Sequence, residues 1–405
     1  MTFNLDKSAW KRATFGDVVR NVKETVRNPD EAGIDRIIAM EHMDPGELKV
    51  GRWGSVEDGT TFTRRVKPGQ TLFGKRRAYQ RKVACGEFDA ICSGDIYTFE
   101  ADETRLLGEF LPFLVQSNEF FDHALGTSAG SLSPRTNWRD LANFEFDLPP
   151  VDEQKRIADL LWAIEYERRA VMVLLKELDN CGIHVRNELF AGLSVETVRF
   201  ESVCTIPSQN GLALKKSERG GDVPMVNMGE MFRGEVISTD TDYERVIAPD
   251  ENFLLAKGDL LFARRSIVFE GAGACCLVPD LDEPFTFESS VIRSRVDREM
   301  VDPAFVLHFF RSERGRESMS AIVRRGPVSG IAGSDLRGLK LPVPDRAVQA
   351  AVIETVERTC SARSAIEQRL AASTVLLRTI SGRIFGGDLW HSSTRPTLFA
   401  TSSAT

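Results

Sequence analysis

The sequence lacks several features that would assign a protein to a class at once. None of its apolar runs approaches the roughly 20 residues that a membrane-spanning helix needs. The first residues carry no apolar core of a signal peptide, so we expect a protein of the cytoplasm. The seven cysteines form no C-x-x-C pair, and Cys275 and Cys276 are adjacent, a poor geometry for a zinc site. We therefore expect reduced thiols and no metal.

Motifs of several enzyme classes are also missing. There is no G-x-x-x-x-G-K-[ST] phosphate loop, and residues 148–151 read LPPV rather than the (N/D)PP(Y/F) of adenine methyltransferases. The five histidines do not cluster. Asp30, Glu47 and Lys49 form a loose nuclease-like PD…ExK pattern, but its flanks lack the apolar strands that such a site needs. We expect a non-catalytic protein with no catalytic residues and no cofactor of its own.

Charge is unevenly distributed along the chain. The net charge of −7 argues against simple neutralisation of nucleic-acid phosphates. Residues 64–82, however, contain eight Lys or Arg and no acid, whereas residues 83–103 contain six Asp or Glu and no base. Because the distribution of charge matters more than its sum, this basic strip is a candidate surface for an anionic partner.

The most informative positive feature is an internal repeat. Residues 148–192 recur at 343–387, an offset of 195, with Gln154 matching Gln349 and Phe190 matching Phe385. So long an offset predicts two large units rather than a solenoid. At 405 residues, with 42 % hydrophobic and 27 % charged residues, the chain has room for two globular domains.

The globular parts repeat as well. Short apolar runs between Gly, Pro and Asp residues indicate strand-rich α/β domains, and the segment 66–77 matches 255–265. Residues 107–121 predict a helix interrupted at Pro112, and residues 301–319 match this segment. A Gly/Ser-rich loop follows in each copy, at 126–141 and 326–336. The order of elements is kept while the side chains between them diverge.

Each repeat ends in a heptad helix of about 40 residues, roughly 60 Å long. A long heptad often forms a homodimer, but the matched register of the two copies favours an intrachain, antiparallel coiled coil. Arg168 and Arg363 occupy equivalent positions, where they either fix the register in the seam or turn out of it. The predicted seam consists of Ile157, Leu161, Ile164, Arg168, Val171, Leu175, Leu178, Val352, Val356, Arg363, Ile366, Leu370, Leu377 and Ile380.

The segment LPPVDEQ at 148–154, which follows an α/β segment and opens a heptad helix, resembles the central spacer of specificity subunits of type I restriction–modification enzymes. The resemblance covers about residues 10–390; the second copy departs from it, with LPVPDRAVQ in place of the double proline. It implies two similar α/β target recognition domains and two long helices related by a pseudo-twofold repeat. The expected boundaries are 1–147 and 197–342 for the domains, 148–196 and 343–390 for the spacer helices, and 391–405 for a disordered tail.

The resemblance also implies a function. Each domain would read one half of a split, asymmetric site in double-stranded DNA, and the helices would set the gap and dock methyltransferase subunits, two of them expected. Restriction subunits would join through these, and S-adenosylmethionine would belong to the partner. The alternatives are a DNA-specificity module of another modification-based phage defence system, a protein-binding coiled-coil scaffold, and, on the Asp30 pattern alone, a nuclease.

Candidate DNA contacts lie in the basic strip, in its counterpart in the second copy and around the Gly/Ser loops. Arginine can neutralise phosphates or reach guanine edges, and Ser or Asn in flexible loops suits groove contact. Because the strip occurs in the first copy alone, we expect the two domains to hold DNA unequally. The candidates are Arg64, Arg65, Lys75, Arg76, Arg77, Arg81, Lys82, Ser131, Ser133, Arg135, Asn137, Arg264, Arg265, Arg324 and Arg325.

Overall fold

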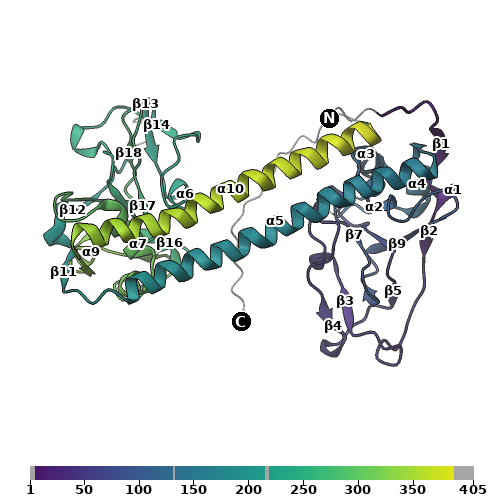
Figure 1. The fold of residues 1–405 in the computed structure, drawn as a ribbon, viewed down its shortest axis with the longest axis horizontal. Coiled ribbons are helices and arrows are strands. Elements are labelled where there is room, and N and C mark those ends of the chain that lie inside the picture. The colour runs from purple at the N-terminus through teal and green to yellow at the C-terminus, as the bar shows by residue number, and fades with distance from the viewer. Residues whose placement is uncertain (1–4, 131–132, 215–218, 387–405) are drawn as a thin grey trace. The chain divides into compact units, whose positions relative to one another are not determined.

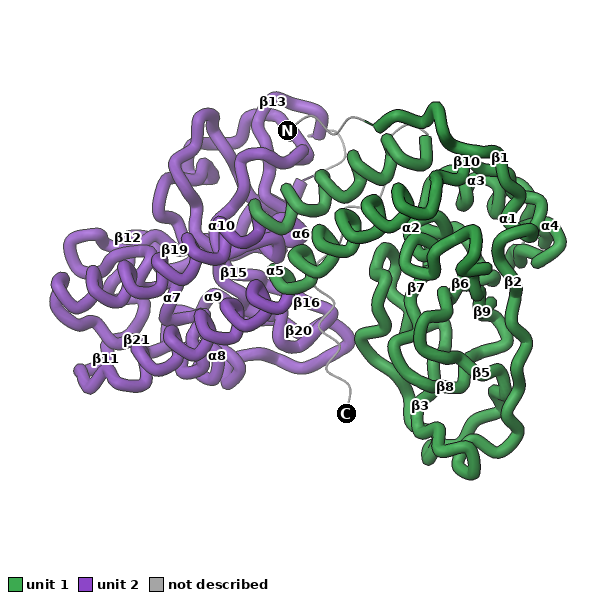
Figure 2. The backbone as a smooth tube through the Cα atoms, turned by 45° about the vertical axis from the view of Figure 1, so that its right-hand side comes forward, with its two compact units in different colours: residues 1–172, 368–405 green, residues 173–367 purple. Residues whose placement is uncertain are grey.

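The computed structural model describes residues 5–130, 133–214 and 219–386. Ser131 and the predicted tail at 391–405 lie outside these residues. The chain divides into two compact units (Figure 2). Unit 1 comprises the residues up to Met172 and those from Gln368 onward, and unit 2 comprises Val173–Glu367. No helix in the described part of the chain is long and apolar enough to cross a membrane.

The globular part of unit 1 is a mixed α/β domain (Figure 1). Its elements are β1 (Lys11–Thr14), α1 (Phe15–Val18), β2 (Val19–Val22), β3 (Arg36–Ile38), β4 (Gly54–Ser55), β5 (Arg64–Val66), β6 (Thr71–Gly74), β7 (Val83–Cys85), β8 (Ala90–Cys92), β9 (Ile96–Ala101), α2 (Leu111–Gln116), α3 (Asn118–Gly126), α4 (Trp138–Ala142) and β10 (Glu145–Leu148). They form sheets ordered β2-β9-β6-β7 and β4-β3-β8-β5, and a ribbon of β1 with β10. Helices α2 to α4 pack on the first sheet through an aromatic core around Phe73, Phe99 and Phe120.

The globular part of unit 2 repeats this plan. Its elements are β11 (Thr197–Arg199), β12 (Cys204–Asn210), β13 (Arg219–Val226), α6 (Met228–Met231), β14 (Glu244–Val246), β15 (Leu260–Ala263), β16 (Arg265–Ser266), β17 (Cys275–Leu277), β18 (Thr286–Phe287), β19 (Val291–Val296), α7 (Pro303–Arg311), α8 (Glu313–Ser320), β20 (Ser329–Gly330), α9 (Gly333–Arg337) and β21 (Lys340–Pro342). The sheet β12-β19-β15-β17 corresponds to β2-β9-β6-β7, and β14-β13-β18 corresponds to β4-β3-β8. The predicted α/β repeat is confirmed.

One local prediction is wrong. The helix expected over 107–121 does not break at Pro112; α2 begins at Leu111 with Pro112 in its first turn, where the missing N–H has no partner to lose. The break lies at Ser117, whose hydroxyl accepts the backbone N–H of Phe120 and caps α3. Ser312 caps α8 in the same way in unit 2, by accepting the backbone N–H of Gly315.

The two long helices are α5 (Val151–Ala191) and α10 (Arg346–Phe385). In unit 1, Ile157 and Leu161 near the start of α5 share a core with Ile380 and Ile384 near the end of α10. In unit 2, the end of α5 shares a core with Val352 near the start of α10. In each unit, therefore, the beginning of one helix lies beside the end of the other, and the predicted intrachain antiparallel pairing is confirmed.

The side chains of the predicted seam are all at least half-buried. Buried are Ile157, Leu161, Ile164, Arg168, Val171, Leu175, Val352, Val356 and Ile380; half-buried are Leu178, Arg363, Ile366, Leu370 and Leu377.

The two seam arginines have different environments. Arg168 is buried and donates to Glu165 on its own helix and, at 2.8 Å, to Glu47 in the connection between β3 and β4. Arg363 is half-exposed and donates to Asp179 of α5 at 2.6 Å. Of the two, Arg363 links the helices, whereas Arg168 ties α5 to the globular part of unit 1.

A buried glutamine fastens the start of α5 to its domain. The side-chain amide of Gln154 donates to the backbone carbonyls of Arg105 and Pro149 at 2.8 and 2.9 Å. Its carbonyl accepts the backbone N–H of Leu107 at 2.8 Å. One side chain thus satisfies three backbone groups that have no partner in a helix or strand.

The same network recurs at the start of α10, 195 residues later. Gln349 donates to the carbonyls of Met300 and Pro344 at 3.3 and 2.8 Å and accepts the N–H of Asp302 at 2.8 Å. The C-terminal ends of α5 and α10 also pack alike. Phe190 packs on Phe305 in unit 2, and Phe385 packs on Phe110 in unit 1. The internal repeat therefore extends to individual hydrogen bonds and ring contacts.

Candidate nucleic-acid interface

In each unit, an arginine-bearing segment that follows a central strand lies beside the Gly/Ser-rich loop. In unit 1, Arg76 pairs with Arg135 in an antiparallel bridge, and the N–H of Thr136 donates to the carbonyl of Lys75. In unit 2, β16 pairs with β20, and the N–H of Ile331 donates to the carbonyl of Arg264. The fold thus brings together, within each unit, two segments that are about 60 residues apart in the sequence.

One carboxylate organises the loop pair of unit 1. Asp95 lies 3.5 Å from the guanidinium of Arg76 and 3.3 Å from that of Arg135. Arg76 also donates from Nε to the hydroxyl of Ser133 at 2.7 Å. These contacts hold the two exposed guanidinium groups in place before any ligand binds.

Arg77 has a left-handed backbone, with φ at 55°. A non-glycine residue rarely adopts this conformation, and its N–H donates to the carbonyl of Pro134, which holds it there. Arg76 and Arg77 line a depression of about 730 Å³, together with His42, Phe62 and others. Asn137, also among the candidates, is exposed just before α4 and donates to Asp140 at 3.3 Å.

Much of the remaining basic strip is bound within the unit. Arg65 pairs with Asp89 at 2.5 Å and with Glu24 at 3.1 Å, and Lys82 donates to the carbonyl of Met40. The acidic stretch 83–103 therefore supplies partners for the strip that precedes it. Because Arg65 is already paired, it is a weaker candidate for a DNA contact than the sequence suggests.

The other strip residues are half-buried. Arg64 donates to the carbonyl of Ile96, and Lys75 lies 5.0 Å above the ring of Tyr97. Burial, followed by the charge of Arg64, lowers the pKa of Lys75. Arg81 lies 4.3 Å above the ring of Phe121, and burial lowers its pKa to about 10.

Unit 2 gathers its four candidate arginines around one depression. Arg264, Arg265, Arg324 and Arg325 all line a hollow of about 520 Å³ beside the Gly/Ser loop. Arg324 pairs with Asp335 at 2.8 Å. For the other three, no carboxylate of a described residue lies within ion-pair distance, so this hollow carries net positive charge suited to an anionic ligand.

Sequence reasoning missed three of these site features. Asp95 was only one acid among six, and nothing local showed that it would lie between two arginines. Asn210, at the end of β12, lines the hollow of unit 2. Ile267 and Val328 are exposed apolar residues beside the arginines of unit 2. The sequence shows Ile267 and Val328 near Arg265 and Arg325, but only the tertiary fold shows that they are exposed and that Asp95 and Asn210 lie at these sites.

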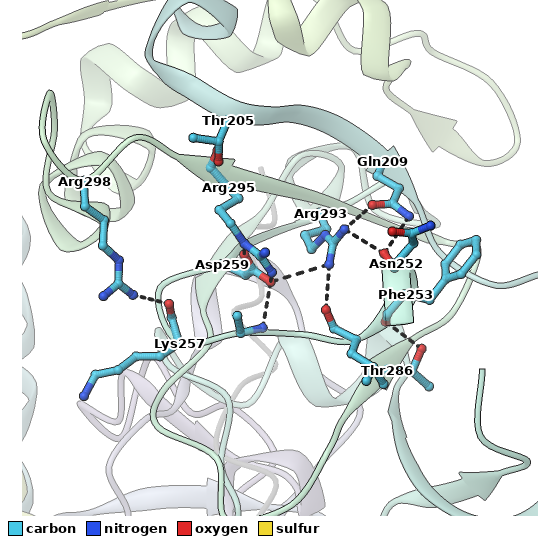
Figure 3. Close-up of polar contacts among 12 residues, drawn as sticks. Thr205, Gln209, Asn252, Phe253, Lys257, Asp259, Thr286, Arg293, Arg295 and Arg298 are labelled. Carbon is cyan, nitrogen blue, oxygen red and sulfur yellow. Dashed lines mark hydrogen bonds and ion pairs between the residues drawn. The ribbon is translucent and has the colours of Figure 1, made fainter. Parts of the chain in front are cut away.

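A polar cluster supports the strand that ends at Asn210 (Figure 3). Arg293 of β19 donates to the side chain of Gln209 and to the carbonyls of Asn252 and Leu254, at 2.9 and 2.7 Å for the carbonyls. Asp259 accepts from Arg295 at 2.6 Å and lies 3.8 Å from Arg293. In the repeat, Gln70 and Thr98 stand at the positions of Asp259 and Arg293, so the Asp259–Arg293 pair has no charged counterpart in unit 1.

The nuclease-like pattern does not form a site in the structure. Glu47 binds Arg168, and Lys49 forms an ion pair with Glu87. The described residues contain no group of three or more His, Cys, Asp or Glu side chains arranged to hold a metal ion. All seven cysteines carry free thiols.

Comparison with known proteins identifies relatives in sequence. No protein-family model matches the chain. It is 26 % identical over 288 residues to the type I restriction enzyme EcoKI specificity subunit of Escherichia coli K12, covering 64 % of this chain and 62 % of that protein. It is 24 % identical over 252 residues to the MjaVIII specificity subunit of Methanocaldococcus jannaschii, covering 56 % and 58 %. The matched part thus spans less than two thirds of these relatives.

Solved structures show the same fold. A structure described as the basis of complex assembly and conformational transition of the type I R-M system is 18 % identical and covers 96 % of this chain and 100 % of its own, with a TM-score of 0.61. The type I restriction–modification S subunit from M. genitalium is 13 % identical and covers 96 % and 99 %, with a TM-score of 0.58. The resemblance indicated by the sequence is therefore confirmed: the chain is similar in sequence to specificity subunits of type I restriction–modification enzymes and has their fold.

Proposed function

We propose that this chain is the DNA-recognition subunit of a type I restriction–modification complex. The proposal rests on the contrast between the side chains that the two units share and those that differ between them. The two units keep the networks of Gln154 and Gln349, yet at equivalent loops they present different exposed side chains. A repeated scaffold with two different arginine-bearing surfaces suits the reading of two different DNA half-sites.

The proposal extends to domains and partners. The target recognition domains are residues 1–147 and 197–342, and α5 and α10 act as the spacer that sets the gap between half-sites. The helices dock two methyltransferase subunits, and restriction subunits join through them. Catalysis and S-adenosylmethionine binding belong to these partners, and the complex acts on DNA in the cytoplasm. The names of the sequence relatives, all specificity subunits, support this assignment.

Mapping of methylated adenines in the host genome tests the proposal. Cells with the gene should carry methylation at a split, asymmetric motif with a fixed gap, and deletion of the gene should remove it. Methylation that is unchanged after deletion would contradict the proposal. A motif without a gap would favour a specificity module of another modification-based defence system.

A binding measurement separates DNA recognition from a protein scaffold. The affinity of the chain for duplex DNA, with its methyltransferase partner present, should fall steeply with salt because bound phosphates release counterions. Purified chain alone should bind no S-adenosylmethionine and cleave no DNA. Affinity that does not depend on salt would favour a scaffold whose globular parts bind proteins.

A further inference from the structure

The loop pair of unit 2 is a short two-stranded ribbon with an apolar end. Arg265 lies opposite Gly330, and Ser266 lies opposite Ser329. Ile267 follows Ser266 and Val328 precedes Ser329, so both residues lie at the same end of the ribbon. Ile267 is 87 % exposed and Val328 is 53 % exposed. Large apolar side chains this exposed, at the same end of one ribbon and beside arginines, indicate a contact surface.

The backbone around this end is fixed by local contacts. The hydroxyl of Ser266 accepts the N–H of Val268 at 3.1 Å, and Arg324 and Gly330 exchange two backbone hydrogen bonds of 2.8 and 3.1 Å. A side chain at Gly330 would meet the carbonyl of Arg264, its Cβ lying 2.9 Å from that oxygen. The exposed tip is therefore presented on a closed ribbon rather than on a free loop.

Unit 1 has no exposed aliphatic residue at the places equivalent to Ile267 and Val268. There the bridge between Arg76 and Arg135 is followed at once by the left-handed Arg77, which bends the chain away. The next residue, Ala78, is buried in the core of unit 1. At this place, therefore, unit 2 exposes the aliphatic residues Ile267, Val268 and Val328, whereas unit 1 exposes Arg77 and, after the buried Ala78, Tyr79.

We propose that the β16–β20 ribbon of unit 2 enters the major groove of duplex DNA and that Ile267 and Val328 contact the C5-methyl group of a thymine. This inference rests on the proposed function. A major groove admits a two-stranded ribbon, and thymine is the one base that offers a methyl group there. The neighbouring Arg265 and Arg325 supply charge complementary to the phosphates and guanine edges on either side of such a contact.

A protein is the other kind of partner that exposed apolar residues at the end of a ribbon could bind. Four arginines line the hollow, and only Arg324 among them pairs with a carboxylate of a described residue. This concentration of unneutralised cations favours DNA, because its phosphates can neutralise them. Arg325 also lies 4.3 Å above the ring of Phe269, which is two residues after Ile267, so a cation lies close to the exposed apolar residues. We therefore commit to thymine as the occupant.

Uracil substitution tests the inference without changing base pairing. In the mapped target site, each thymine is replaced in turn by uracil, which lacks only the methyl group. Binding is measured with the full chain in complex with its methyltransferase partner. One or two uracil positions within a single half-site should weaken binding about fourfold, the effect of one methyl group taken out of water. In the double variant Ile267→Ala/Val328→Ala, thymine and uracil at those positions should bind equally.

The controls separate the possible outcomes. Ile247→Ala, a truncation of another exposed apolar side chain of unit 2, should leave the thymine preference intact. A site at which uracil has no effect anywhere, or at which the double variant still prefers thymine, overturns the inference. So does a double variant that fails to assemble with the methyltransferase while binding DNA normally. A chain that shows no sequence preference on any duplex overturns the proposed function itself.

Discussion

At the scale of single residues, a partly buried ion cluster in unit 2 makes stability depend on pH. Glu235 accepts two hydrogen bonds from Arg186 of α5, at 2.7 and 2.9 Å, and lies 3.5 Å from Arg311 of α7. His308 lies beside it, with Nδ1 3.7 Å from the Glu235 carboxylate. Burial, followed by the charge of Arg186, lowers the pKa of His308 from 6.5 to about 4. His308 is therefore neutral in the folded protein at pH 7.

The first prediction follows from this shift. As pH falls, the unfolded chain takes up a proton at His308 near pH 6.5, whereas the folded chain does so only near pH 4. The contribution of neutral His308 to stability is therefore complete above about pH 6.5. As pH falls from 6.5 to 4.5, this contribution should decrease by roughly 2 kcal/mol. Denaturant unfolding at a series of pH values should show a shallower loss for His308→Asn than for the wild type. Replacement of the exposed His184 by Asn is the matched control, and equal slopes for all three proteins would contradict the prediction.

A second prediction concerns Arg168, which faces the fully buried Glu165. The variant Arg168→Met leaves that carboxylate without its cation and should cost about 3–5 kcal/mol of unfolding free energy. Adding Glu165→Met should recover part of the loss because the fully buried carboxylate is then gone, whereas the partly exposed Glu47 stays unpaired. Arg369→Met, which breaks the exposed pair with Glu167, should cost about 1 kcal/mol or less. Equal losses for the two single variants in urea unfolding would show that Arg168 is not a structural ion-pair residue.

At the scale of elements, the third prediction concerns the glutamines at the helix starts. Gln154→Leu keeps the volume but leaves the N–H of Leu107 and two carbonyls unsatisfied, which should cost about 2–4 kcal/mol. Gln349→Leu should cost a similar amount, and the two losses should add because the sites share no partner. Gln368→Leu, at an exposed position of α10, should change the urea midpoint little. A non-additive pair would indicate that the two helix starts are coupled.

The elements also show what sequence reasoning can reach. The long helices and their antiparallel pairing follow from the heptads and the repeat, since an apolar stripe of that length must be covered. The ion pair of Arg168 with Glu47 could not be predicted, because it joins residues 121 positions apart. The sequence analysis placed the helix break at Pro112 rather than at Ser117, because proline interrupts a helix interior. In the structure Pro112 lies in the first turn of α2, where proline is well tolerated. Likewise, nothing local to Asn210 indicates its place beside the arginines, and nothing local to Ile267 indicates that it is exposed.

At the scale of the whole molecule, the two units differ in how their basic residues are used. The sequence places the larger basic cluster in the first domain. Within that cluster, Arg65 is paired with acids and Lys82 with a carbonyl, which leaves Arg76 and Arg77 at the loop. Unit 2 has fewer basic residues in sequence but gathers four arginines at one hollow. Unequal binding of DNA by the two domains thus stays a prediction, and we now expect unit 2 to contribute more of the binding than unit 1.

The last prediction tests the independence of the two units by reversing charge in one at a time. Arg76→Glu/Arg77→Glu should weaken binding about 10- to 100-fold and relax sequence preference in one half-site only, since arginine contacts to bases and phosphates are local. Arg264→Glu/Arg265→Glu should do the same in the other half-site. Competition binding with libraries in which one half-site is randomised measures both effects. Lys11→Glu/Arg12→Glu reverses an adjacent exposed pair in unit 1 and should leave preference unchanged. If either loop variant relaxed both half-sites together, the units would read DNA as one surface, and the assignment of one half-site to each would be wrong.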